Sequence, residues 1–478
     1  MIAGKLLSYE AALAYLYGRI DYERAKDGNR GHDFRLQRTR ELFERLDLGR
    51  YLHQEDHPSP PVPVIHIAGT KGKGSTATMV GDILGTAGYR VGVYTSPHLT
   101  DLEERFRING VPCRPEELIE LVEHVRPVVD AMDEEETISF FELTTALSVL
   151  HFDRNDCEAI VLEVGLGGRL DSTNVCASHI AAITSIGLDH QRVLGNSRPE
   201  IAAEKAGIIK SPSPVVSGVQ DPASVAVIRA VAAAANATFH QSGEAFRVED
   251  FEPLSEGSRF RFVTHSESDA ESESLDVVLG LDGIHQAENA AVAIAISRLL
   301  RDRLDVDDEA IRRGLSRTRC AGRFERFPLG GRRQVIVDTA HNEDSIAALC
   351  ATIRGCVARE SVASPVVVVF GSSRDKDVAS MASRLAVLAD EVICTQFTEP
   401  PRFLDAASAE KAFTVAGARK TSVEPNAKRA LDAGRQSIAN GGTLVVCGSF
   451  FLAGELRPII SDWEASPMAE PACSESDA

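Results

Sequence analysis

HIAGTKGKGSTATMV, residues 66–80, joins a short apolar run, Val64 to Ala68, to a segment with the composition of a helix. The apolar run has the length of a buried strand, and we predict that a helix begins at Ser75. A strand, a glycine-rich loop and a helix in this order bind phosphate, since backbone N–H groups and the positive end of the helix face the anion. The usual phosphate loop has Ser or Thr directly after its lysine, but here Gly74 separates Lys73 from Ser75.

The loop after this predicted strand is the candidate nucleotide site. Its residues are Gly69, Thr70, Lys71, Gly72, Lys73, Gly74 and Ser75. Lys73 places a positive charge near the outer phosphates, while Ser75 either caps the helix or contacts phosphate. A plain glycine-rich turn is the alternative, but the glycines, lysines and adjacent hydroxyl residues favour phosphate binding. The chain has no [NT]-K-x-D segment for guanine, and GLGGRLD (165–171) lacks the third glycine of a dinucleotide-binding loop, so ATP is the predicted nucleotide.

Polar residues follow three further predicted strands in the first half of the chain. The strand RVGVYTSPHL ends at Ser96, EAIVLEVGLGG ends near Glu163, and HIAAITSIGLDH ends near His190. Because the carboxyl ends of parallel strands share one edge of a sheet, we expect these residues to lie beside the loop. The oxygens of Ser96 and Glu163 suit Mg²⁺, whereas His190 is a less usual ligand with a hydrogen-bonding role as the alternative. Lys205 lies on a predicted helix, where a surface lysine is the simplest interpretation.

The second half of the chain repeats the alternation of strands and helices, which predicts a second α/β domain. We expect an ATP-binding domain over residues 1–317, a C-terminal domain over 318–464 and a disordered tail over 465–478. The segment 245–281, with an acidic loop at 265–276, predicts a β-hairpin excursion from the first domain.

Polar residues also gather at an expected strand end and at the boundary of this second domain. They are Arg323 in GRFERF and Asp338, His341 and Asn342 in VDTAHNEDS. Loops at strand ends are where α/β domains carry function. Helix capping is the alternative role for Asp338 and Asn342, and pairing with an acidic neighbour is the alternative for Arg323.

Composition limits the class of protein. The 478 residues are 44% hydrophobic and 25% charged, which is typical of a soluble globular chain. The formal net charge of −19 argues against nucleic-acid partners. The nine cysteines contain no C-x-x-C pair, which predicts reduced thiols and no zinc site. No apolar run approaches the roughly 20 residues of a membrane span, and the N-terminus lacks a signal-peptide pattern, so we expect a cytoplasmic protein with no membrane partner.

Nine motifs in a fixed order resemble one known family. They are HIAGTKGKGST, YTSPHL, LEVGLGGRLDSTN, ITSIGLDH, AAEKAGIIK, GIHQAENAAVA, AGRFE, DTAHN and DKD. Together they resemble the folylpolyglutamate synthase/dihydrofolate synthase family, a branch of the Mur ligase superfamily. The resemblance spans essentially the whole chain, from SYEAALAYLYGRIDYER to VVCGSFF.

This resemblance implies an α/β fold: a P-loop ATPase domain with a mostly parallel sheet, plus a smaller Rossmann-like C-terminal domain. It implies an ATP-dependent ligase that adds L-glutamate to tetrahydrofolate, with dihydropteroate as a further acceptor, through an acyl phosphate. ATP and two Mg²⁺ sites are the implied cofactors. The implied partners are small molecules only (folate or dihydropteroate, L-glutamate and ATP), and the implied oligomeric state is a monomer.

The resemblance also assigns roles residue by residue. Metal ligands are Ser96, Glu163, His190 and Lys205, with Lys205 carbamylated. Residues that contact ATP outside the loop are Asn289, Arg323, Asp338 and His341. Catalytic residues are Lys73, Lys205, His190 and Arg323. His98, in TSPHL, is placed near the folate site.

Two departures and two alternatives accompany this hypothesis. Thr339 stands where a smaller residue is common, and Glu343 follows Asn342 in place of a frequent proline, which puts the local loop shape in question.

A Mur-type ligase for a cell-wall precursor is one alternative, although the about 60 residues before the loop are few for an extra domain. The other alternative is a non-catalytic ATP-binding protein. The complete set of site residues argues against it.

Overall fold

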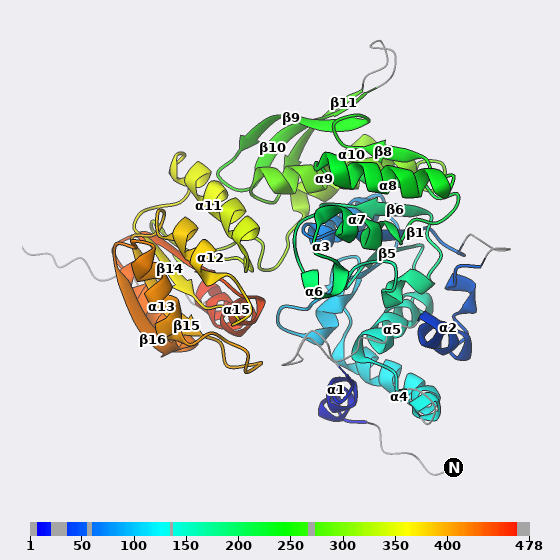
Figure 1. Cartoon of the computed structure of the whole chain (residues 1–478), viewed down its shortest axis with the longest axis horizontal. Helices are drawn as coiled ribbons and strands as arrows, with labels where there is room; N and C mark the ends of the chain where they lie inside the picture. The colour runs from blue at the N-terminus through cyan, green and yellow to red at the C-terminus, as the bar shows by residue number, and fades with distance from the viewer. Residues whose placement is uncertain (1–6, 21–35, 55–59, 134–136, 266–272, 466–478) are drawn as a thin grey trace, which may run out of the picture. The chain divides into compact units, whose positions relative to one another are not determined.

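The computed structural model describes residues 7–20, 36–54, 60–133, 137–265 and 273–465 (Figure 1). The chain divides into two compact units. Unit 1 comprises Met1–Gly280 and Ile284–Thr318, and unit 2 comprises Leu281–Gly283 and Arg319–Ala478. Each unit has its own central sheet, and each is described separately below.

Unit 1 is built on an eight-stranded sheet in the order β4-β3-β2-β5-β1-β6-β7-β8. The strands are β1 (Val64–Ala68), β2 (Val91–Tyr94), β3 (Phe106–Ile108), β4 (Val111–Pro112), β5 (Ala159–Glu163), β6 (Ile180–Ile183), β7 (Val215–Ser217) and β8 (Phe239–Gln241). The pairs from β2 through β8 are parallel, and β3 and β4 add an antiparallel edge. Strands β1, β2, β5 and β6 are buried at every position, as continuous apolar runs in a covered parallel sheet require.

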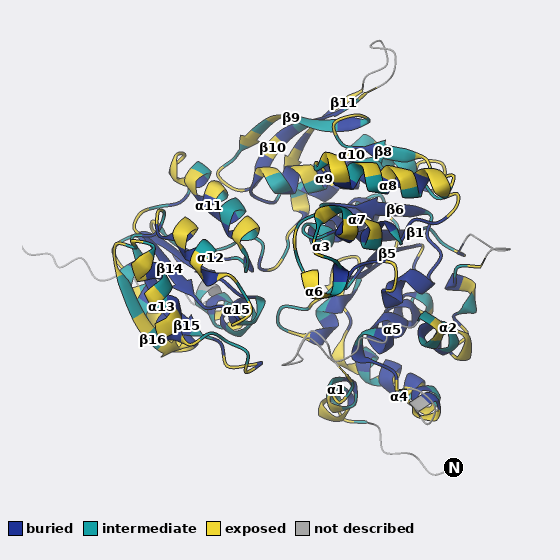
Figure 2. Ribbon diagram, viewed as in Figure 1, coloured by how far each residue is buried: buried dark blue, intermediate teal, exposed yellow. Residues whose placement is uncertain are grey.

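Helices cover this sheet. The helices of unit 1 are α1 (Tyr9–Tyr17), α2 (Leu36–Arg45), α3 (Lys73–Thr86), α4 (Pro115–Asp133), α5 (Phe140–Arg154), α6 (Gln191–Leu194), α7 (Arg198–Ala206), α8 (Pro222–Ala234), α9 (Ile284–Leu299) and α10 (Asp308–Arg317). Val64, Ile160 and Leu162 form one core with apolar residues of α1, α2, α4 and α5. A second core joins Ala181 and Ile183 to α7 and α8. In Figure 2 the central strands β1, β5 and β6 are dark blue, and exposed residues lie on the outer faces of the helices.

The predicted excursion contains three strands rather than a two-stranded hairpin. β9 (Phe246–Pro253), β10 (Ser258–Thr264) and β11 (Ser274–Leu279) form an antiparallel sheet. Exposed and buried residues alternate along β11, because one face of the strand is covered and the other meets solvent. Most of the acidic loop, residues 266–272, lies outside the described residues.

Unit 2 is a six-stranded sheet in the order β12-β13-β17-β14-β15-β16. Its strands are β12 (Glu325–Pro328), β13 (Arg333–Val337), β14 (Val366–Phe370), β15 (Glu391–Gln396), β16 (Thr421–Asn426) and β17 (Gly442–Cys447). Its helices are α11 (Glu343–Val357), α12 (Val378–Leu385), α13 (Ala406–Val415), α14 (Ala427–Ser437) and α15 (Phe450–Ala465). Only β12 is antiparallel to its neighbour among these described strands. The α/β class predicted from the sequence is confirmed in both units.

Several predicted boundaries are wrong. The fourth strand of the first half ends at Ile183 rather than near His190, so a loop carries the following residues to the sheet edge. The loop after α8 leads into the edge strand β8. The predicted tail begins at Ala465, which is the last residue of α15, and its remaining residues, 466–478, lie outside the described residues. Among the residues described, no helix is both long enough and apolar enough to cross a membrane.

Candidate active site

The phosphate-binding loop connects β1 to α3, and the helix begins at Lys73 rather than at Ser75. Gly72 precedes the helix with φ 84°, in the left-handed region, which glycine adopts without steric cost. A Cβ at this position would lie 2.2 Å from Oδ1 of Asn289. Because the turn is made at Gly72, Ser75 lies inside the first helical turn, and the prediction that Ser75 caps the helix is wrong.

Gly74, the extra glycine after Lys73, faces a carboxylate. A Cβ on Gly74 would lie 3.2 Å from Oε2 of Glu163. The same Oε2 accepts the N–H of Ser96 at 3.1 Å, and Oε1 lies 4.0 Å from Nζ of Lys73. The sheet topology explains this arrangement, because β5 is the neighbour of both β1 and β2. The missing side chain therefore leaves room for a buried carboxylate at the start of the phosphate-binding helix.

Thr70 and Lys71 are anchored to the loop that follows β6. Their N–H groups donate to the carbonyl and hydroxyl oxygens of Ser185, at 2.8 and 2.9 Å. The hydroxyl of Thr70 accepts the N–H of Gly187 at 3.0 Å. These bonds join the phosphate-binding loop to the loop after β6 and fix the backbone of both. The Lys71 side chain extends toward Asp189, with Nζ 3.5 Å from Oδ2.

His190 precedes the short helix α6 with φ 50°. Its N–H donates to Oδ1 of Asp189 at 3.0 Å, and its side chain is 58% exposed. The neighbouring Asp189 is the better-buried group of the two, at 19%. The sequence did not single out Asp189 as a site residue, yet it contacts the loop lysine Lys71.

Lys205 is buried, so the interpretation of a surface lysine is wrong. It lies on α7 and is 4% exposed. Burial, followed by the nearby Lys73 ammonium, lowers the pKa of Lys205 to about 7, against smaller opposing effects of Asp189 and Asp171. The backbone of α7 packs closely against the loop after β5, since a Cβ on Gly168 would lie 2.9 Å from the Lys205 carbonyl oxygen. A substantial fraction of this amine is therefore neutral near pH 7.

Asp171, which sequence analysis did not single out, shapes the GLGGRLD loop. Its carboxylate accepts the N–H of Leu166 at 2.8 Å and the N–H of Thr173 at 3.0 Å. Burial raises the pKa of Asp171, although these bonds oppose the shift. The signal for Asp171 was its place at the end of a glycine-rich turn, where Asp commonly bonds its own backbone.

Unit 2 brings its candidate residues together around one loop. Arg323 donates to the hydroxyl of Thr339, and its guanidinium carbon lies 5.0 Å from the ring centre of Phe450. Asp338 accepts the N–H groups of Phe324 and Ala340, both at 2.8 Å. Desolvation raises the pKa of Asp338, and the Arg323 charge opposes that shift. Asp338 therefore fixes backbone next to Arg323 and does not cap α11.

His341 and Asn342 lie just before α11. Nδ1 of His341 lies 2.8 Å from the carbonyl oxygen of Thr339. Oδ1 of Asn342 accepts the N–H of Ser345 at 3.0 Å and caps the helix. The capping alternative is thus confirmed for Asn342.

A cluster of aromatic and polar side chains surrounds His98 in unit 1. Nε of Arg105 donates to Nδ1 of His98 at 2.9 Å, and the hydroxyl of Tyr17 lies 3.4 Å from Nε2. The rings of Tyr17 and Phe140 stack with centres 5.6 Å apart. Arg105 is 1% exposed, and its guanidinium carbon lies 5.1 Å from the centre of the Phe140 ring. Tyr17 and His98 are half-buried, whereas Phe140 and Arg105 are buried.

Comparisons with known proteins decide between the hypotheses. Residues 67–297 match the Mur ligase middle domain, and residues 322–450 match the Mur ligase, glutamate ligase domain. The chain is 35% identical over 398 residues to a dihydrofolate synthase/folylpolyglutamate synthase of Bacillus subtilis, a match that covers 82% of this chain and 86% of that protein. The chain belongs to the folylpolyglutamate synthase/dihydrofolate synthase family. It is a Mur-type ligase, and neither the cell-wall alternative nor the non-catalytic one is favoured.

Solved members of the folylpolyglutamate synthase/dihydrofolate synthase family share this fold. The Mycobacterium tuberculosis folylpolyglutamate synthase complexed with ADP is 30% identical, with a TM-score of 0.81 over 95% of this chain and 99% of that chain. Escherichia coli FolC in complex with DHPP and ADP is 29% identical, with a TM-score of 0.76 over 95% of this chain and 98% of that chain. A probable bifunctional folylpolyglutamate synthase/dihydropteroate synthase of Haloferax volcanii is 33% identical over 86% of this chain, which spans only 47% of that longer protein.

The side chains near the loop fit Mg²⁺ in part. The Glu163 carboxylate beside Gly74 and the Ser96 hydroxyl supply the hard oxygen ligands that Mg²⁺ prefers. Lys205 as an amine or ammonium supplies no oxygen. It fits a metal site only when its nitrogen carries a carboxylate, which its lowered pKa favours.

Proposed function

We propose that this ligase adds L-glutamate to tetrahydrofolate, and also to dihydropteroate, at the expense of ATP. The cluster at the start of α3 carries the proposal. There Lys73, the Glu163 carboxylate and the buried amine of Lys205 converge on a glycine-rich phosphate loop. The proposed substrates are inferred from the names of the relatives.

The reaction follows from the chemistry of a carboxylate, which is a poor electrophile. Transfer of the γ-phosphoryl group of ATP to a folate carboxylate oxygen gives an acyl phosphate and ADP. The neutral amine of glutamate then attacks the acyl carbon, the C–O bond to phosphate breaks, and the amide, inorganic phosphate and a proton are released. Lys73 and Arg323 offset negative charge on the transferring phosphoryl group. Asn289, Asp338 and His341 are the further proposed ATP-binding residues.

Ser96, Glu163, His190 and carbamylated Lys205 are the proposed ligands of two Mg²⁺ ions. Bound Mg²⁺ neutralises charge on the phosphates during transfer. The neutral Lys205 amine would attack CO₂, giving a carbamate and a proton, and so replace a cation with two oxygen ligands. The lowered pKa of Lys205 supports this step, since only the unprotonated amine reacts.

The His98 cluster is the proposed binding site for the pterin part of the acceptor. Its half-buried Tyr17 and His98 offer aromatic rings with polar atoms, which suit a flat, polar heterocycle. We further propose that the enzyme is a cytoplasmic monomer, because ATP and glutamate are abundant there and unit 1 carries both the phosphate loop and the acceptor cluster. Sedimentation of the purified chain tests the oligomeric state.

A glutamate-dependent assay of ADP release tests the proposed function, with tetrahydrofolate and dihydropteroate supplied separately. The expected result is turnover with at least one acceptor and a matching increase in product mass by one glutamate. Hydroxylamine added in place of glutamate should give the acceptor hydroxamate, which reports the acyl phosphate. No ADP release with either acceptor would overturn the proposal, and release without any hydroxamate would remove the acyl phosphate from it.

A further inference from the structure

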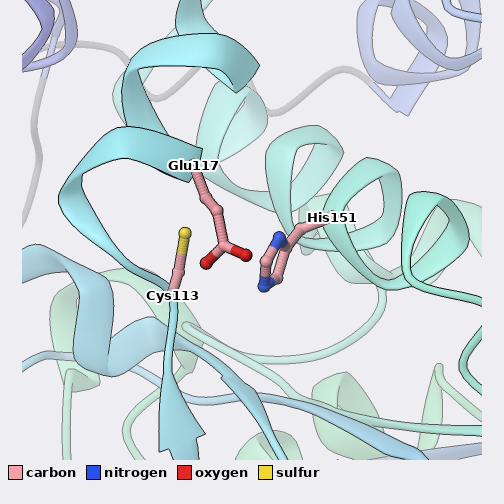
Figure 3. Close-up of side chains that lie close together, drawn as sticks. All are labelled: Cys113, Glu117 and His151. Carbon is pink, nitrogen blue, oxygen red and sulfur yellow. The ribbon is translucent and has the colours of Figure 1, made fainter.

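A second cluster of ligand-bearing side chains lies in unit 1 apart from the phosphate loop. Cys113 follows β4, Glu117 lies in the first turn of α4, and His151 lies near the end of α5 (Figure 3). One potential ligand atom from each side chain lies within 4.8 Å of the other two. Cys113 and His151 are each 3% exposed. Figure 3 shows the three side chains pointing toward one another.

The backbone and neighbouring groups hold this cluster in place. The Cys113 N–H donates to the carbonyl oxygen of Phe106 at 2.7 Å, which fixes the chain where the thiol emerges. The Glu117 carboxylate accepts the N–H of Arg114 at 2.8 Å and its guanidinium at 3.1 Å. A carboxylate has about four lone-pair sites, so Glu117 retains the capacity to bind an ion.

The spacing suits a small tetrahedral ion. Bonds of about 2.0–2.3 Å to zinc place ligand atoms about 3.3–3.8 Å apart, so side-chain rotations that shorten the present separations by about 1 Å complete such a site. The Glu117 side chain is 26% exposed, which gives an ion a path from solvent to two buried partners. A solvent molecule occupies the remaining position in a site with three protein ligands.

The identity of the ligands selects the class of ion. Thiolate and imidazole favour zinc and related transition metals, whereas Mg²⁺ and Ca²⁺ prefer sites made of oxygen alone. We propose that Cys113, Glu117 and His151 bind one divalent transition-metal ion of the zinc class, which links the corner between β4 and α4 to α5. The site shares no residue with the proposed Mg²⁺ ligands and is independent of the proposed ligase reaction.

The sequence predicted no zinc site because the three ligands do not form a recognisable motif along the chain. Cys113 precedes α4 and Glu117 lies in its first turn, but His151 comes from the next helix. α4 and α5 pack in one core, to which Cys113 also belongs. The three ligands therefore meet only after this core has formed. A buried cysteine that merely fills space is the competing interpretation, and it makes no demand on the two neighbours.

Cobalt substitution tests the proposal on the full-length, untagged chain. The chain is stripped with a chelator, kept reduced, and titrated with Co²⁺ and with Zn²⁺. The expected result is one ion per chain, a near-ultraviolet charge-transfer band from thiolate to cobalt, and loss of that band on addition of stoichiometric Zn²⁺. Cys113→Ser should abolish the band, and His151→Ala should weaken binding at least tenfold.

Cys157→Ser is the matched control, because Cys157 is another buried thiol of unit 1, 5% exposed, and lies outside the cluster. This variant should keep the band and the stoichiometry. Cobalt binding without a thiolate band, or a band that survives in Cys113→Ser, would overturn the proposal. Failure of the chain to bind either ion would also overturn it. The spectrum of the unmodified chain decides the question even if a variant does not fold.

Discussion

Replacing Lys205 with methionine is expected to stabilise unit 1 at neutral pH while abolishing ligation. Methionine has a similar unbranched shape without the charge, so it fills the same space. The unfolded chain holds the lysine proton up to its ordinary pKa of 10.5, whereas the folded chain holds it only to about 7. Between these values the unfolded state binds more protons, and the stability of the native enzyme therefore rises with pH.

The size of this effect follows from the shift. Each pH unit between the two pKa values is worth about 1.4 kcal/mol, so Lys205 costs on the order of 5 kcal/mol of unfolding free energy below pH 7. Most of that cost disappears by pH 10. The methionine variant has no such group, so its advantage over the native chain should be largest near pH 7 and small near pH 10.

Calorimetric unfolding in CO₂-free buffer at pH 7 and pH 9.5 measures the difference. The fluorescence of Trp463 is unsuitable, because this residue lies on α15 in unit 2. Lys428→Met, at an exposed lysine of unit 2, is the control and should change stability at neither pH. Bicarbonate should stabilise the native chain and leave Lys205→Met unchanged. A methionine variant that is no more stable than the native chain at pH 7, with the same pH dependence, would refute the reasoning.

Four further outcomes are expected. Gly74→Ala places a methyl group 3.2 Å from Glu163 Oε2, so the Mg²⁺ concentration for half-maximal turnover should rise by about tenfold or more, with little change in the calorimetric melting temperature. Lys73→Ala should lower kcat by about 10²–10³ in the ADP-release assay. Glu163→Gln removes the anion beside the loop, so it should lower turnover with MgATP yet tighten binding of metal-free ATP in equilibrium dialysis. Arg326→Met removes the partner of the buried Asp282 carboxylate, whose Oδ1 lies 3.0 Å from the guanidinium. The free energy of unfolding should fall by about 3–5 kcal/mol, as measured by denaturant unfolding followed by tryptophan fluorescence. An unchanged unfolding midpoint would contradict this prediction.

The central strands of both sheets could be predicted from sequence, and the edge strands could not. β1, β5 and β14 are buried at every position and almost wholly apolar, because helices cover both faces of a parallel sheet. β16, with the sequence TSVEPN, is exposed or half-buried throughout, and its polar residues and proline resemble a loop. An edge strand pairs with a neighbour on one side only. Such pairing leaves little periodicity of apolar residues in the sequence.

The candidate site could be predicted where its residues follow strands. Glu163 and Ser96 meet because β5 and β2 are neighbours and both end at the same edge. Lys205 is different, since it is buried only once α7 packs in the folded unit. Its local sequence, with charges on either side, is that of a surface helix. The resemblance to a family singled out this lysine, and the structure supplies the physical reason.

The glycine that follows Lys73 in the phosphate loop affects how the site binds cations. Gly74 brings the Glu163 carboxylate to the positive end of α3, within 4.0 Å of the Lys73 ammonium. An anion at a helix N-terminus is stabilised by the helix dipole, so Glu163 occupies the same favourable field as the phosphates. Two anions at one helix end repel each other unless a cation lies between them. We therefore predict that ATP binds weakly to this chain in equilibrium dialysis until Mg²⁺ is added, because the Glu163 carboxylate repels the phosphates when no cation lies between them.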